Sequence, residues 1–181
     1  MIGIVRPLRR ALRRFLKVER GTATIEFVLV FPPLMLLFIS AFEAGLMQVR
    51  HTMLDQGLDK SVRTLRLGTN APLAYADLKQ AICDGAGLIP NCMDNLKLEM
   101  VRIDPQTTMN VTVHADCVDR AEPLAPVREY AVGDENDLML LRACVLFDPM
   151  FPTTGLGFQM PKKSGDAYAL VSMSSYVSEP N

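Results

Sequence analysis

The longest apolar segment of the chain lies near its N-terminus. It runs from Phe27 to Met47 and contains one charged residue, Glu43, and one small polar residue, Ser40. As an α-helix this segment would be about 32 Å long, and the hydrocarbon core of a bilayer is about 30 Å thick. The pattern therefore predicts a transmembrane helix over about residues 27–47. The alternative is a buried helix of a soluble protein, which the basic residues before the segment disfavour.

After the apolar segment the pattern changes to that of an amphipathic helix. Apolar side chains recur at spacings of three to five, and this set is Phe42, Leu46, Val49, Met53, Leu58, Val62 and Leu65. Such a period places them on one face of a helix, which then needs a partner surface. Gly68 and Pro72 end the pattern. The sequence thus predicts one continuous helix over residues 22–67, transmembrane in its first half and packed on the rest of the protein in its second.

The remaining residues, 68–181, predict a small head. A short helix is expected from about Pro72 to Ile82. Strands are expected at Lys97–Asp104, Met109–Val118, Leu138–Phe147 and Ala169–Val177. The segment Leu138–Phe147 is apolar on both faces except at Arg142, which predicts a central strand. The expected fold class is α+β, with the long N-terminal helix packed on a small antiparallel sheet.

Charge is distributed unevenly along the chain. Seven of the 19 basic residues lie within residues 1–20 beside a single acid, and the rest of the chain is acidic, although the formal net charge is only −1. Basic residues next to a transmembrane helix hold that end in the cytoplasm, so the head is expected on the other side of the membrane. A nucleic-acid-binding protein usually carries its positive charge on the folded part. The distribution therefore argues against a nucleic-acid partner.

The cysteine content fits the oxidising side of a membrane. The four cysteines are an even number and form no Cys-x-x-Cys motif. Cys83 and Cys92 flank a loop with glycine and proline that can bring its ends together, which leaves Cys117 and Cys144 as a second pair. Four cysteines allow three connectivities, and the sequence leaves the choice open. Four buried free thiols are the other alternative.

Residues with catalytic or metal-binding chemistry are sparse. The two histidines, His51 and His114, lie in no tight cluster with cysteine, and the chain has no glycine-rich phosphate loop and no Gly-x-Ser-x-Gly motif. The acidic loop with Asp134, Glu135 and Asp137 is more typical of a solvated surface than of a cation site. The sequence predicts no catalytic residue, no metal and no cofactor, and hence a protein that is not an enzyme.

Two residues at the start of the apolar segment are costly in a membrane helix. Gly21 weakens helix continuity by about 1 kcal/mol relative to alanine, and Glu26 places an acid at the start of a membrane span. This segment resembles the processing site of type IV prepilins, in which a glycine is followed by four residues, by a glutamate and then by an apolar helix. Here these residues are Gly21 and Glu26-Phe27. The similarity is closest to the Flp/Tad (type IVb) subclass and its TadE-like pseudopilins. It covers about residues 17–67 and includes Phe42-Glu43-Ala44-Gly45.

This resemblance implies a pilin-like protein that a prepilin peptidase cuts on the cytoplasmic face, after Gly21 and before Thr22. Residues 1–21 would be a basic leader, and residues 68–181 a periplasmic head on a single span of the bacterial inner membrane. In the family, the acid that corresponds to Glu26 is thought to pair with the new N-terminal amine of a neighbouring subunit.

The implied function is that of a minor pilin or pseudopilin that helps to initiate, stabilise or regulate a Tad-type adhesion pilus. Its partners would be the peptidase, other pilin-like subunits, pilus assembly proteins and membrane lipid, and whether it enters the pilus after processing stays open. One alternative is an uncleaved, membrane-anchored periplasmic component of the same machine, and another is an anchored extracytoplasmic enzyme or sensor. Glu43, about 26 Å along the helix from Glu26, is expected to mark the far membrane boundary.

Overall fold

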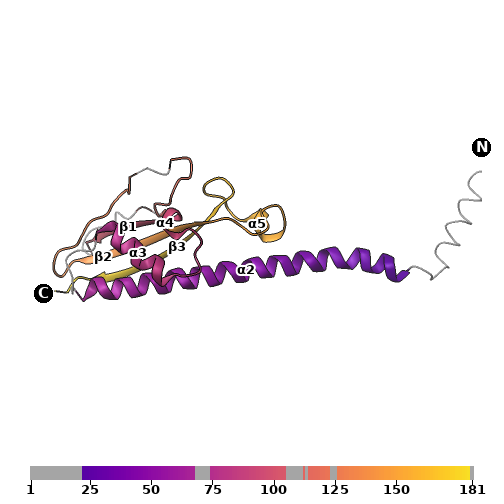
Figure 1. Ribbon diagram of the computed structural model, residues 1–181, viewed down its shortest axis with the longest axis horizontal. Helices are drawn as coiled ribbons and strands as arrows, with labels where there is room; N and C mark the ends of the chain where they lie inside the picture. Colours follow the sequence, from indigo (N-terminus) through magenta and orange to yellow (C-terminus); the bar gives the residue numbers. More distant parts are fainter. Residues whose placement is uncertain (1–21, 68–73, 105–111, 113, 123–125, 180–181) are drawn as a thin grey trace, which may run out of the picture.

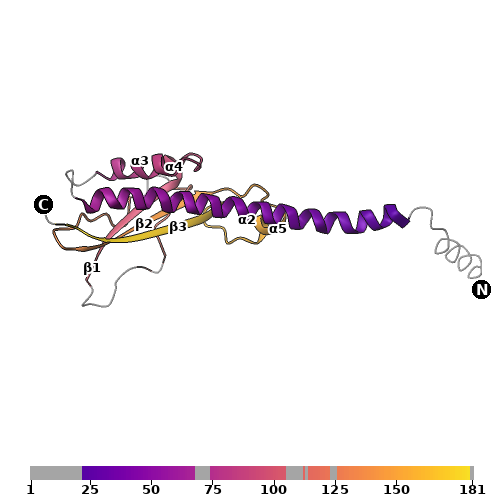
Figure 2. The same cartoon turned by 90° about the horizontal axis from the view of Figure 1, so that it is seen from below.

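The structure, a computed structural model, describes residues 22–67, 74–104, 112, 114–122 and 126–179. The helices are α2 (Thr22–Arg66), α3 (Tyr75–Gly85), α4 (Cys92–Asn95) and α5 (Gly155–Gln159), and the strands are β1 (Leu96–Ile103), β2 (Leu138–Phe147) and β3 (Tyr168–Val177). Figures 1 and 2 show α2 lying along the head with its C-terminal half and extending beyond it with its N-terminal half. The predicted α+β class and the continuous N-terminal helix are confirmed.

The three strands form one antiparallel sheet in the order β1-β2-β3. Leu98 pairs with Ala143, and Ala143 pairs with Ser172. The strand β2 is therefore central, as its apolar pattern predicted, and most of its side chains are buried. A central strand has no solvated face, so its sequence reads as a nearly continuous apolar run.

The helices α2 and α3 cover one face of the sheet. Their buried residues Leu54, Leu58, Leu78 and Ile82 form one core cluster with alternate residues of the strands. Where the two helices cross, the backbones lie very close together, because a Cβ atom added to Gly85 would lie 2.8 Å from the Cα of Gly57. The amphipathic half of α2 thus finds its partner surface within the chain.

The opposite face of the sheet carries buried charge. Arg142 of β2 pairs with Glu99 of β1 at 2.7 Å, and both side chains are almost fully buried. Lys97 pairs with Asp116 at 3.1 Å. Arg142 also donates to the carbonyl oxygen of Thr112 at 2.7 Å. These contacts hold part of the β1–β2 connection on the sheet.

One predicted strand, Met109–Val118, is wrong for the residues that the structure describes. Residue 112 and residues 114–118 belong to no strand, and the other residues of that segment lie outside the described part of the chain. The outer edge of β1 is instead bonded by a short bridge between Met100 and Tyr130. The described residues of the segment make single contacts, such as the Lys97–Asp116 ion pair, and no strand ladder.

The remaining differences concern short helices. The helix expected at Pro72–Ile82 is α3, which the structure places at Tyr75–Gly85. The helices α4 and α5 were not predicted, because they have only four and five residues. Segments of that length show no helical period in their sequence.

Candidate functional site

The N-terminal half of α2 presents an almost wholly apolar surface. Its exposed large apolar residues are Ile25, Phe27, Val28, Leu29, Val30, Phe31, Leu34, Leu36, Leu37, Phe38 and Phe42. In the described part of the chain, α2 is the one helix that is long and apolar enough to cross a membrane, and this suggests membrane anchoring. A helix that is apolar all round is suited to lipid or to a bundle of similar helices.

The residues expected to govern processing and assembly lie at the start of this surface. Gly21 is outside the described residues, and Thr22 is the first residue of α2. Glu26 and Phe27 are both exposed, and the ring of Phe27 stacks on that of Phe31 with 4.8 Å between centroids. Thr22, Glu26 and Phe27 belong to the first turns of α2, at the end that is far from the head and drawn in indigo in Figure 1.

A second group of residues, unpredicted as a site, joins α2 to the head. Glu43 is only 1% exposed. Its carboxylate accepts hydrogen bonds from the backbone N–H of Met150, at 3.0 Å to Oε1 and 3.2 Å to Oε2, and from the N–H of Phe151 at 3.3 Å. Backbone donors offset the cost of burying the carboxylate. Glu43 is thus a binding residue for the β2–β3 connection, which goes beyond its expected role as a membrane-boundary marker.

Arg50, on the same face of α2 two turns later, makes the next contact. Its guanidinium lies over the ring of Phe147, 4.9 Å from the centroid, and donates a hydrogen bond to the Tyr168 hydroxyl at 3.2 Å. Burial raises the pKa of Tyr168, and the contact with Arg50 partly opposes that increase. The spacing of Glu43 and Arg50 is visible in the sequence, but their partners are more than 90 residues away.

A third contact involves His51 and Asp55. The His51 Nε2 atom lies 3.2 Å from the carbonyl oxygen of Val171, and its Nδ1 atom lies 3.5 Å from Asp55. The hydroxyl of Ser172 donates to the other oxygen of Asp55. In a nucleophilic triad the serine would donate to the histidine, whereas here it donates to the carboxylate. These residues therefore join α2 to β3 and do not form an activated nucleophile.

The cysteines form two disulfides in the head. Cys83 is bonded to Cys92, and Cys117 to Cys144. The first closes the loop between α3 and α4, and the second ties the β1–β2 connection to the central strand. Of the three connectivities that the sequence left open, this is the one that pairs the two loop-flanking cysteines.

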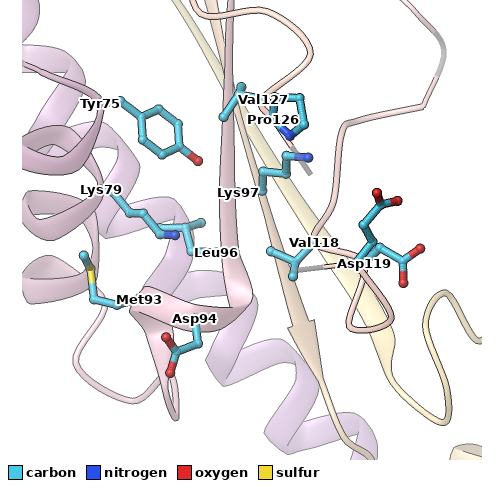
Figure 3. Close-up of a pocket in the computed structure, with 11 residues that line it drawn as sticks. Tyr75, Lys79, Met93, Asp94, Leu96, Lys97, Val118, Asp119, Pro126 and Val127 are labelled. Carbon is cyan, nitrogen blue, oxygen red and sulfur yellow. The ribbon is translucent and has the colours of Figure 1, made fainter. Parts of the chain in front are cut away.

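A groove of about 530 Å³ lies between α3, β1 and residues 118–122 and 126–127 (Figure 3). Two of its polar groups are already paired within the chain. The Tyr75 hydroxyl accepts a hydrogen bond from the Leu98 N–H at 3.2 Å, and Lys97 is bonded to Asp116. Burial lowers the pKa of Lys79 on the groove wall. Among the described residues, no group of three or more His, Cys, Asp or Glu side chains could hold a metal ion.

A comparison with known families finds a match that covers most of α2. Residues 21–63 match the family model described as TadE-like protein. No curated protein and no solved structure matches the chain. The matched segment contains Gly21, Thr22, Glu26, Phe27 and Glu43, and thus both ends of the apolar surface. The resemblance is confirmed over this segment, and the TadE-like family suggests a component associated with the Tad pilus.

Proposed function

We propose that this chain is a minor pilin or pseudopilin of a Tad (Flp) pilus assembly system, cut by a prepilin peptidase after Gly21. In this proposal residues 1–21 are a cytoplasmic leader, α2 is anchored in the inner membrane, and the head lies in the periplasm. The two disulfides support an oxidising location for the head. The match over residues 21–63 supports the association with the pilus machine.

The observation that carries the proposal is the position of Glu26. Its side chain is exposed on a surface that is otherwise apolar. No hydrogen bond or ion pair joins it to another residue within the part of the chain that the structure describes. An acid beside lipid is costly unless it has a partner, so we expect Glu26 to have one in the assembled protein. The amine that cleavage would create on Thr22 of a neighbouring subunit is a suitable partner.

The apolar surface supports assembly by helix packing. Helices in lipid gain little from the hydrophobic effect when they associate, so close packing and polar pairs must hold them together. The exposed rings of Phe27 and Phe31 offer a packing surface one turn from Glu26. A charge pair beside this surface would fix the register between neighbouring helices.

The experiment replaces Glu26 by glutamine, which keeps the size of the side chain and removes its charge. We expect the E26Q protein to be inserted and cut, because neither step uses this carboxylate. It should fail to co-purify with other pilin-like subunits and to support pili in a strain that lacks the wild-type chain. The matched control is E135Q, which removes a charge from an exposed loop of the head and should behave as the wild type.

Normal pili and normal co-purification with E26Q would contradict the assembly role. They would show that Glu26 only marks the membrane boundary. An uncleaved wild-type chain that still supports pili would instead favour an anchored assembly component that is never processed.

A further inference from the structure

The connection between β2 and β3 displays two large apolar side chains to the outside. Phe158 of α5 is 68% exposed and Met150 is 57% exposed. Both lie beside the contact between this connection and α2. Large exposed apolar patches mark protein or membrane interaction sites, and the exposed apolar surface of α2 adjoins this connection.

The connection is held in a defined position by close contacts. Glu43 binds the N–H groups of Met150 and Phe151. Gly155 has a φ of +56°, and a Cβ atom at this position would lie 2.5 Å from the Ser40 hydroxyl oxygen. This close approach seats α5 directly against α2. The two apolar side chains are therefore presented by an anchored segment.

The height of this contact along α2 coincides with the far membrane surface for a span that begins near Thr22, five residues before the apolar segment at residues 27–47. From Thr22, Ser40 lies about 27 Å along the helix and Glu43 about 32 Å, and the hydrocarbon core is about 30 Å thick. Figures 1 and 2 both show α5 beside α2, at the end of the head that faces the N-terminal half of the helix. A span that begins near Thr22 would thus reach the far headgroups where α5 contacts it.

We propose that the segment 148–160 is a second membrane contact, in which Phe158 and Met150 enter the boundary between headgroups and acyl chains. This inference rests on the membrane span included in the proposed function. Phenylalanine and other apolar side chains of interfacial segments are buried at this depth. Lys163, which follows α5 and is exposed, can extend toward lipid phosphates, whereas Lys162 is paired with Asp166. The contact would fix the depth and orientation of the head relative to the bilayer.

The test uses the fact that the chain contains no tryptophan. Single tryptophans are introduced by F158W, by V177W and by F31W in the full chain. The protein is reconstituted into vesicles of phosphatidylethanolamine and phosphatidylglycerol that contain lipids brominated high on the acyl chain. Val177 is an exposed apolar residue at the far end of β3, about 30 Å along the strands from Phe147. Phe31 reports on the span itself.

We expect bromolipid to quench the F158W tryptophan several-fold more than the V177W tryptophan, with a blue-shifted emission. Equal, weak quenching at positions 158 and 177, together with strong quenching at 31, would overturn the second contact and leave the span intact. Weak quenching at position 31 would overturn both the span and this inference. If the F158W emission shifts only after other pilin-like subunits are added, the surface binds protein instead of lipid, and the proposal is wrong.

Discussion

The Glu43 carboxylate accepts a hydrogen bond from the backbone N–H of Met150, a residue 107 positions later in the chain, at 3.0 Å. The same carboxylate accepts from the N–H of Phe151. One side chain of the long helix thus fixes the start of the β2–β3 connection. This contact lies where the exposed apolar surface of α2 ends and the head begins, so it couples the position of the head to that of the N-terminal half of α2.

Replacing Glu43 by alanine should loosen this connection without unfolding the sheet. The substitution leaves two backbone donors without their acceptor, which costs about 1–3 kcal/mol for a buried group. Hydrogen exchange should accelerate by about tenfold or more at the amides of residues 149–160, while the amides of β2 stay protected. The control E135A, on an exposed loop, should leave both regions unchanged. Equal exchange in E43A and wild type at residues 149–160 would show that Glu43 does not hold the connection.

The buried pair of Glu99 and Arg142 predicts that replacing one residue lowers the free energy of unfolding much more than replacing both. E99Q alone should lower the free energy of unfolding by about 3–5 kcal/mol, because it leaves a buried guanidinium without its counter-charge. The double variant E99M/R142M should recover most of this loss. Denaturant unfolding of the protein in detergent micelles measures both.

The exposed pair of Arg66 and Glu179, 2.9 Å apart, is the matched control for the buried one. E179Q should change the free energy of unfolding by less than about 1 kcal/mol, since exposed pairs contribute little. A loss in E99Q no larger than that in E179Q would contradict the role given to the buried pair.

The two disulfides should contribute unequally to stability. They enclose sequence separations of 9 and 27 residues. In the loop-entropy model, the variant C83A/C92A should lose about 2.7 kcal/mol and C117A/C144A about 3.6 kcal/mol. The second variant should also free residues 114–118 for proteolysis. A larger loss from C83A/C92A than from C117A/C144A in denaturant unfolding would contradict this order.

The tyrosines predict a loss of stability at high pH. Burial raises the pKa of Tyr130 to about 12 and raises the pKa values of Tyr75, Tyr168 and Tyr176 above 10. The folded protein then binds these protons more tightly than the unfolded chain does, so their contribution is complete below pH 10 and declines as the pH rises above it. Absorbance measured after rapid increases to a series of pH values should show that tyrosinate forms at a higher pH in the folded protein than in the denatured one. Identical titration near pH 10 in both states would refute the prediction.

The parts of the fold that could be predicted depend on local pattern. The long helix follows from the period of its apolar residues, and the central strand follows from its continuous run of apolar residues. Both patterns can be recognised from residues that are close together in the sequence. The segment Met109–Val118 has the same alternation as a strand, yet its described residues make isolated contacts with Lys97 and Arg142. Alternation alone does not distinguish a strand from a loop that is fastened to a sheet.

The residues expected to govern processing and assembly differ in the same way from the residue that joins α2 to the head. Gly21 and Glu26 are recognisable because they interrupt an apolar pattern within a few residues of each other. The partners of Glu43 are backbone N–H groups of Met150 and Phe151, which no side-chain pattern marks. The contact is therefore recognisable only in the folded structure, in which the β2–β3 connection lies against α2.

The central claim, that the chain is processed as a pilin-like subunit, is tested most directly by the mass of the protein purified from membranes. We predict a species that lacks residues 1–21 and begins at Thr22 when the prepilin peptidase is present, and the full-length chain when the peptidase gene is deleted. The variant G21L should stay full-length in both strains and still insert, because insertion depends on the apolar segment and its basic flank. An intact Met1 in the presence of an active peptidase, or a cut beyond Ala41, would contradict the account.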